Sequence, residues 1–141
     1  MIERFLYEKS VAHQSCLIIP FVDSIVNDQD FYSYALLSEQ GYNSVLHQAK
    51  NPALRYGTEL EGIVAIAKRH LNQQIILEGT GYFYQRYTYR HNLIILHQTG
   101  NKCYYDHYAP NNLVNIAAPR IFSSAEECIE WVRTGLEAQS A

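Results

Sequence analysis

The chain has 141 residues and a mass of 16.3 kDa, with 48% hydrophobic and 18% charged residues. This length suits one domain, and the composition excludes intrinsically disordered, collagen-like and disulfide-scaffold proteins. No apolar run approaches the roughly 18 residues that a membrane span needs, and residues 1–4 lack the basic-then-apolar order of a signal peptide. We therefore expect a single soluble domain, residues 1–141, in the cytoplasm, with no membrane partner.

The net charge is -3, from 11 basic and 14 acidic residues, which disfavours a protein that coats duplex nucleic acid by electrostatic attraction. This charge is distributed unevenly along the chain. No acidic residue lies between Glu78 and Asp106, so this stretch carries +3 while the rest of the chain carries -6. Six of the twelve tyrosines fall in the same stretch, which makes it a candidate binding surface.

The first part of the chain predicts strands followed by one helix. Apolar residues at alternate positions indicate a long, bent strand with one side in the core: Phe5, Tyr7, Val11, Leu17 and Ile19. A turn at 27–30 predicts a second strand over 31–37, and Gln40-Gly41 indicates a further strand near 42–47. A helix is expected over 58–71, where Thr58 and Glu61 form a capping box ahead of apolar residues at helical spacing.

The same kinds of element recur after a linker at about 73–81. A second strand pattern places one set of side chains on the core side: Phe83, Tyr87, Tyr89, Leu93 and Ile95. A turn at 99–102 predicts a strand over 103–108. Ser123 and Glu126 then form a capping box at the start of a helix over 123–136.

These two halves superpose on each other, residues 4–72 as one copy and 82–138 as the other. A shift of 65 residues aligns the helices with their caps, and a shift of 76 aligns Leu17-Ile18-Ile19 with Leu93-Ile94-Ile95. We interpret this as a tandem strand-strand-helix duplication, the alternative being chance similarity of two amphipathic units. In either case we predict an α+β fold, with a mainly antiparallel sheet, two helices on one face and the other face partly open.

The open face would present tyrosine and arginine side chains. If the alternation holds through 82–92, the side away from the core carries Tyr82, Tyr84, Arg86, Thr88, Arg90 and Asn92. This pattern suits a contact with a protein partner or a second copy of the chain, in which tyrosine and arginine are favoured. It also suits stacking of single-stranded nucleic acid, and an aromatic ladder that only stabilises the sheet has the same pattern.

A metal-dependent enzyme is a weaker alternative. Its ligands would be imidazole and carboxylate groups suited to zinc, provided by His91, His97, Asp106 and His107. Residues 91 and 97 are six apart, however, which is roughly 20 Å along a strand, so both could bind one ion only if the strand bent sharply.

The remaining sequence shows no assembled catalytic set. Three widely spaced cysteines form no CxxC pair, which indicates reduced thiols. Cys16 and Cys128 lie in apolar patterns and are expected to be buried and inert, while Cys103 is the only candidate nucleophile. We therefore expect a non-enzymatic interaction module without a cofactor. It would bind a protein partner or a second copy of itself through Tyr82, Tyr84, Arg86, Arg90 and Asn92.

Overall fold

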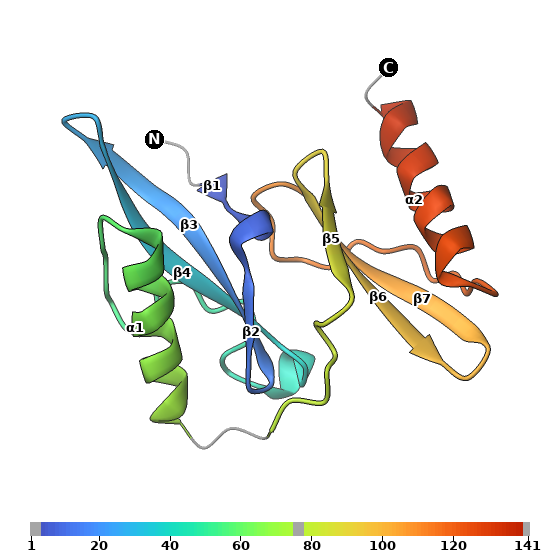
Figure 1. Ribbon diagram of the computed structural model, residues 1–141, viewed down its shortest axis with the longest axis horizontal. Helices are drawn as coiled ribbons and strands as arrows, with labels where there is room; N and C mark the ends of the chain where they lie inside the picture. The colour runs from blue at the N-terminus through green and yellow to red at the C-terminus, as the bar shows by residue number, and fades with distance from the viewer. Residues whose placement is uncertain (1–3, 75–77, 140–141) are drawn as a thin grey trace.

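The computed structural model of the protein describes residues 4–74 and 78–139 (Figure 1). Its strands form two antiparallel sheets, one of four strands and one of three. The first sheet contains β1 (Arg4–Phe5), β2 (Val11–His13), β3 (Cys16–Val26) and β4 (Gln29–Ser38). The second contains β5 (Arg86–Tyr89), β6 (Asn92–Thr99) and β7 (Lys102–Tyr108). The α-helices are α1 (Leu60–Asn72) and α2 (Ala125–Gln139).

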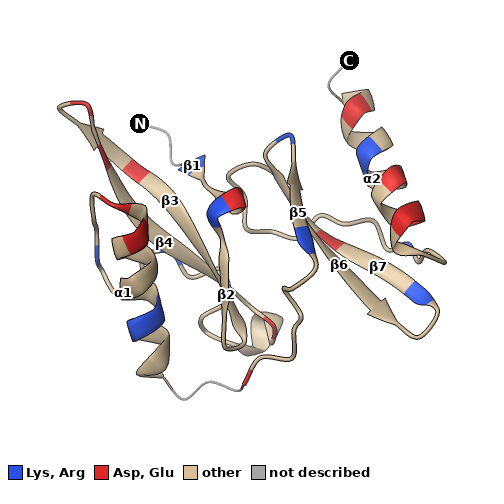
Figure 2. Cartoon of the chain, viewed as in Figure 1, with Lys and Arg blue, Asp and Glu red and all other residues tan. Residues whose placement is uncertain are grey.

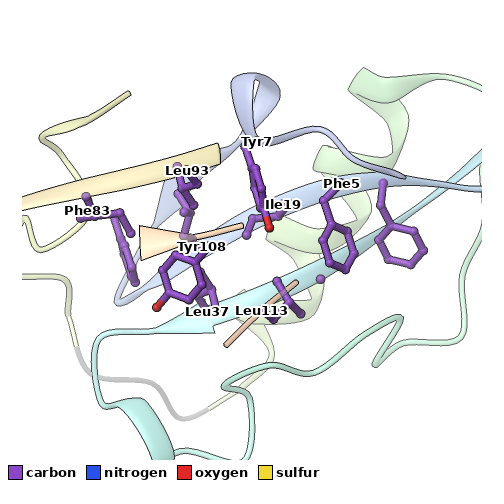
Figure 3. Close-up of a cluster of buried hydrophobic side chains, with 12 residues drawn as sticks. Phe5, Tyr7, Ile19, Leu37, Phe83, Leu93, Tyr108 and Leu113 are labelled. Carbon is purple, nitrogen blue, oxygen red and sulfur yellow. The ribbon is translucent and has the colours of Figure 1, made fainter. Parts of the chain in front are cut away.

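The two sheets pack face to face, and each carries one helix on its outer face (Figure 1). Side chains from both sheets meet in a central core, which Figure 3 shows: Phe5, Tyr7, Leu17, Ile19, Phe21, Ala35, Leu37, Phe83, Leu93, Ile95, Tyr108 and Leu113. A second cluster lies between the first sheet and α1, and a third between the second sheet and α2. The order of layers is therefore helix, sheet, sheet, helix.

The two apolar triplets explain this layering. Leu17 and Ile19 point into the central core, while Ile18 points to α1. In β6, Leu93 points into the central core and Ile94 points to α2. Because successive side chains of a strand point to opposite faces, an unbroken apolar triplet needs a cover on both sides.

The predicted α+β class with antiparallel strands is confirmed, but the strands form two sheets and not the single sheet that we expected. The expected placement of both helices on one face is also wrong, because each helix packs on a different sheet. One sheet with an open face would have left the central-core side chains in water, and packing a second sheet against them removes this cost. Each half has strands followed by a helix, with the same alternation about its triplet. Common ancestry of the halves remains a hypothesis.

Several predicted elements differ in detail. The long strand expected from residue 5 is interrupted by a 3-10 helix, η1 (Tyr7–Lys9), so β1 and β2 pair separately with β3. The strand expected near 42–47 is instead a 3-10 helix, η2 (Gly41–Asn43), followed by turns. Residues 48–57 then run along the outer edge of β4 and form backbone hydrogen bonds with it. An edge that is already paired in this way offers few free groups to another strand.

Both helices begin two residues later than predicted, at Leu60 and Ala125, and their N-terminal caps lie one residue later. The N-cap of α1 is Glu59, which makes no side-chain capping bond, so Thr58 and Glu61 do not form a capping box. At α2 the hydroxyl of Ser124 accepts a hydrogen bond from the backbone N–H of Glu127 at 3.1 Å. The capping interaction is therefore one position later than the expected pair of Ser123 and Glu126, because two adjacent serines offer the same cap.

Two predictions fall partly on residues that the structure does not describe. Residues 75–77 of the expected linker and residues 1–3 of the segment considered as a signal peptide lie outside the described residues. Within residues 4–74 and 78–139, neither helix combines the length and the apolar character that crossing a membrane requires.

Tyr7 connects the two halves of the protein and is 2% exposed. Its hydroxyl lies 2.7 Å from the carbonyl oxygens of both Ala109 and Asn112, which share its single hydrogen, and it accepts from the backbone N–H of Asn112 at 3.3 Å. The 3-10 helix η1 directs this side chain into the central core, with its hydroxyl against the loop after β7.

Tyr7 should make the protein less stable at alkaline pH. Burial raises the pKa of Tyr7 to about 12. Because the unfolded chain releases this proton near pH 10, the stabilisation is fully present below pH 10 and is lost as the pH rises toward 12. We expect the free energy of unfolding, measured with urea, to fall across this window, and to fall less steeply in Tyr7→Phe. An equally steep decline in the variant would contradict this assignment.

Candidate functional site

The predicted open face does not exist, because the first sheet covers it. Phe83, Leu93 and Ile95, which were expected on the same side as Tyr87 and Tyr89, instead pack in the central core. Tyr87 and Tyr89 pack toward α2, as expected, so Arg86 and Thr88 point away from the helix. That direction leads to the first half of the protein. Arg86 Nε lies 2.9 Å from Ser10 Oγ, and Nη2 lies 2.9 Å from the carbonyl oxygen of Ser10. Burial lowers the pKa of Arg86, and its guanidinium joins the two halves.

Arg90 and Asn92 lie at the far end of β5 from Tyr82 and Tyr84. Arg90 and His91 both have positive φ, 51° and 65°, and form the tight turn between β5 and β6. The Arg90 guanidinium lies 5.5 Å from the centre of the Tyr89 ring. Asn92 is buried, and its Nδ2 donates to the carbonyl oxygens of Tyr89 and Arg90. Whether either residue binds a partner stays a prediction.

Tyr82 and Tyr84 come together in a different place, a surface groove of about 660 Å³. We call this site the tyrosine groove, and its lining consists of Gly79, Thr80, Gly81, Tyr82, Tyr84, Gln85, Leu96, His97, Gln98 and Tyr104. Tyr84 is 76% exposed and Tyr104 is 39% exposed, which leaves two large aromatic side chains open to a ligand. The lining contains aromatic, amide and hydroxyl groups but no lysine, arginine, aspartate or glutamate.

A buried pair of charged or chargeable groups forms the floor of the groove. His97 Nε2 lies 2.9 Å from Asp106 Oδ2, and both residues are 7% exposed. The Tyr82 hydroxyl donates to the same carboxylate oxygen at 2.9 Å, and Asn115 Nδ2 donates to Oδ1 at 2.9 Å. This carboxylate and burial together raise the pKa of Tyr82, burial being the larger cause. Asp106 is therefore hydrogen bonded on both oxygens.

The imidazole of His97 is stacked between two tyrosine rings. Its centre lies 4.0 Å from that of Tyr82 and 5.0 Å from that of Tyr104, with the planes tilted by 39° and 35°. Cross-strand pairing explains this arrangement, since His97 is opposite Tyr104 and Ile95 is opposite Asp106 in the β6–β7 register. Side chains directly or diagonally opposite on one face of a sheet are in contact. The floor is thus held by strand geometry and is pre-formed.

The wall of the groove depends on close contact between the connection at 78–81 and the first sheet. A Cβ on Gly79 would lie 2.0 Å from the carbonyl oxygen of Gln14, so only glycine fits there. The backbone N–H of Thr80 donates to the Glu39 carboxylate at 3.1–3.2 Å, and the Thr80 hydroxyl donates to it as well. Glu39 follows β4, so the first sheet holds the wall of the groove in place, while the second sheet provides its floor.

The metal alternative is not supported by the positions of its four residues. His97 and Asp106 form a pair, but His107 points to the other face of β7 and lies 2.8 Å from Asn92. His91 is in the exposed turn before β6. Burial lowers the pKa of His107. Among residues 4–74 and 78–139, no group of three or more histidine, cysteine, aspartate or glutamate side chains could hold an ion.

The three cysteines are all buried. Burial raises the pKa of Cys16 to about 11 and that of Cys128 to about 12, which keeps both thiols protonated near neutral pH. The expectation that these two are buried is confirmed. Cys103, the candidate nucleophile, is only 2% exposed and does not line the groove.

Sequence reasoning missed Tyr104 as a site residue, although a signal for it was present. The turn at 99–102 forms a hairpin in which Thr99 pairs with Lys102. Two residues away from the turn on each strand, His97 is therefore opposite Tyr104. The groove therefore combines a predicted tyrosine pair with a histidine and an aspartate that we had considered as metal ligands. No protein-family model matches this sequence, and no similar curated protein or solved structure was found.

Proposed function

We propose that the protein is a non-enzymatic interaction module that binds another protein, or a second copy of itself, through the tyrosine groove. The observation that carries this proposal is the exposure of Tyr84 and Tyr104 beside a floor that is already hydrogen bonded. Tyrosine provides a large contact area with few rotatable bonds, and it is enriched where proteins meet. A pre-formed floor lowers the entropic cost of association.

Single-stranded nucleic acid has less support than a protein partner. A site that follows a phosphate backbone needs cationic side chains beside its aromatic ones. The lining of the groove includes neither lysine nor arginine, and the guanidinium of Arg86 is hydrogen bonded within the protein. We therefore place protein recognition first.

Photocrosslinking tests this proposal. We would replace Tyr84 with p-benzoylphenylalanine and, as a matched control, replace Tyr56, which is 54% exposed and does not line the groove. After irradiation in a lysate of the source organism, we expect a discrete adduct from position 84 that position 56 does not form. Self-association would appear as a crosslinked dimer of purified protein and as a doubled mass in light scattering. The proposal fails if position 84 gives no specific adduct and the purified protein stays at 16.3 kDa.

A further inference from the structure

We infer that the tyrosine groove accepts a cationic side chain, lysine or arginine, of its partner. The partner itself rests on the proposed function above, whereas the preference for a cation follows from the groove's own aromatic and acidic groups. Two observations support it: the aromatic lining and the acidic groups behind this lining. The position of a nearby cation, Lys102, gives a further test.

The tyrosine rings of the groove can attract a cation. A lysine or arginine within about 6 Å of a ring face is attracted by the negative potential of that face, most strongly where several rings converge. Tyr82, Tyr84 and Tyr104 all line the groove, and Tyr84 and Tyr104 have large exposed areas. Gly81 has a φ of 88°, and a Cβ there would lie 3.3 Å from the Tyr84 ring, so one side of this ring packs against the backbone turn.

Acidic side chains lie close behind the lining of the groove. Two carboxylates lie one hydrogen bond behind the lining, because Asp106 accepts from Tyr82 and Glu39 accepts from Thr80. The one residue of the lining that can become positive is His97. Among the lining residues and the side chains hydrogen bonded to them, two carboxylates stand against one imidazole, while the guanidinium of Arg86 is held by Ser10 and the Phe83 carbonyl oxygen. A cationic group entering the groove therefore gains electrostatic attraction, and an anionic group is repelled.

The nearest basic residue on the same strand sharpens the prediction. Lys102 lies at the β6–β7 turn, two residues before Tyr104 and outside the lining (Figure 2). In Figure 2 the end of β7 at the β6–β7 turn is blue, for a basic residue, and a red, acidic position lies toward the other end. Because like charges repel, Lys102 would weaken the binding of a cation. Its removal should strengthen that binding, which a neutral ligand would not show.

The test compares two probes of the same shape and different charge. We would titrate the full-length, ¹⁵N-labelled protein with Nα-acetyl-arginine methylamide and with the citrulline analogue, in which the guanidinium is replaced by a neutral urea. We expect the arginine probe to bind about fivefold more tightly, which corresponds to roughly 1 kcal/mol of cation–π and Coulomb attraction. The shifted amides should include those of Gly81, Tyr84 and Tyr104. This difference should decrease as salt is added.

Variants assign the effect to the groove. Tyr84→Ala and Tyr104→Ala should remove most of the preference for the arginine probe, while Tyr84→Phe keeps the ring and should retain it. Tyr56→Ala is the control for loss of an exposed tyrosine elsewhere, and Lys102→Gln should increase the affinity for arginine alone. The ¹⁵N spectrum of each variant reports whether it is folded. Equal binding of the two probes, no binding of either, or full preference in Tyr84→Ala would overturn the inference.

Failure of this inference can be distinguished from failure of the proposed function. A specific adduct at position 84 without any preference between the probes would support the interaction module and contradict the binding of a cationic side chain. A preference for the arginine probe without an adduct or dimer would support a cation site and contradict the proposed protein partner.

Discussion

Replacing Asp106 with alanine is expected to lower the free energy of unfolding by about 3–5 kcal/mol. The carboxylate is 7% exposed and accepts hydrogen bonds from Tyr82 and Asn115, with His97 at 2.9 Å. Without it, the buried His97 and the half-buried Tyr82 lose their partner, whereas the exposed Asn115 can bond to water, and each buried group left unsatisfied costs about 1–3 kcal/mol. Urea denaturation followed by circular dichroism measures the loss.

Asp106→Asn separates the two roles of this side chain. It retains the size of the carboxyl group and one acceptor oxygen but removes the charge, so we expect a smaller loss than in the alanine variant. A loss below about 1 kcal/mol in Asp106→Ala would show that the groups around the groove find other partners. The proposed floor would then be adaptable and not pre-formed.

Ile19→Ala is expected to lower the free energy of unfolding by about 2–5 kcal/mol. Ile19 is fully buried between the two sheets, and opposite it in β4 stands Ala35, which is too small to fill the space left by the truncation. Val45→Ala, at a position that is 96% exposed, is the control and should change stability by less than about 0.5 kcal/mol.

The same variant tests whether the halves unfold together. Trp131 is the only tryptophan and lies on α2, in the other half of the protein from Ile19. Because the central core includes residues of both sheets, the Ile19→Ala substitution should shift the fluorescence transition of Trp131 as much as it shifts the circular dichroism transition. An unchanged tryptophan transition would indicate two units that unfold independently.

The strands and helices could largely be predicted because local patterns determine them. The triplets around Ile18 and Ile94 and the apolar stripes of the helices identify elements without knowledge of their neighbours. The covering of each strand face could not be predicted in this way. Alternation indicates which side chains share a face, and the same pattern is produced whether that face meets a helix, a second sheet or water.

The candidate site shows the same division. Tyr82 and Tyr84 were predicted as binding residues, and the groove brings them together. Arg86 was expected in solvent because its partner, Ser10, is 76 residues away and no local pattern connects the two. His97 was considered as a metal ligand, but its pairing with Asp106 depends on the register of the hairpin. That register can be predicted only when the turn residues are known.

The contact of Gly79 and Thr80 with the first sheet has a thermodynamic consequence for any ligand. One side of the groove is held by residues 14 and 39 of the first half, and the opposite side is formed by strands of the second half. A molecule bound there contacts residues 79–81, which the first half holds in place, and has no comparable site on the unfolded chain. Occupancy is thus linked to the docking of one half on the other, and a saturating ligand should raise the melting temperature of the whole protein.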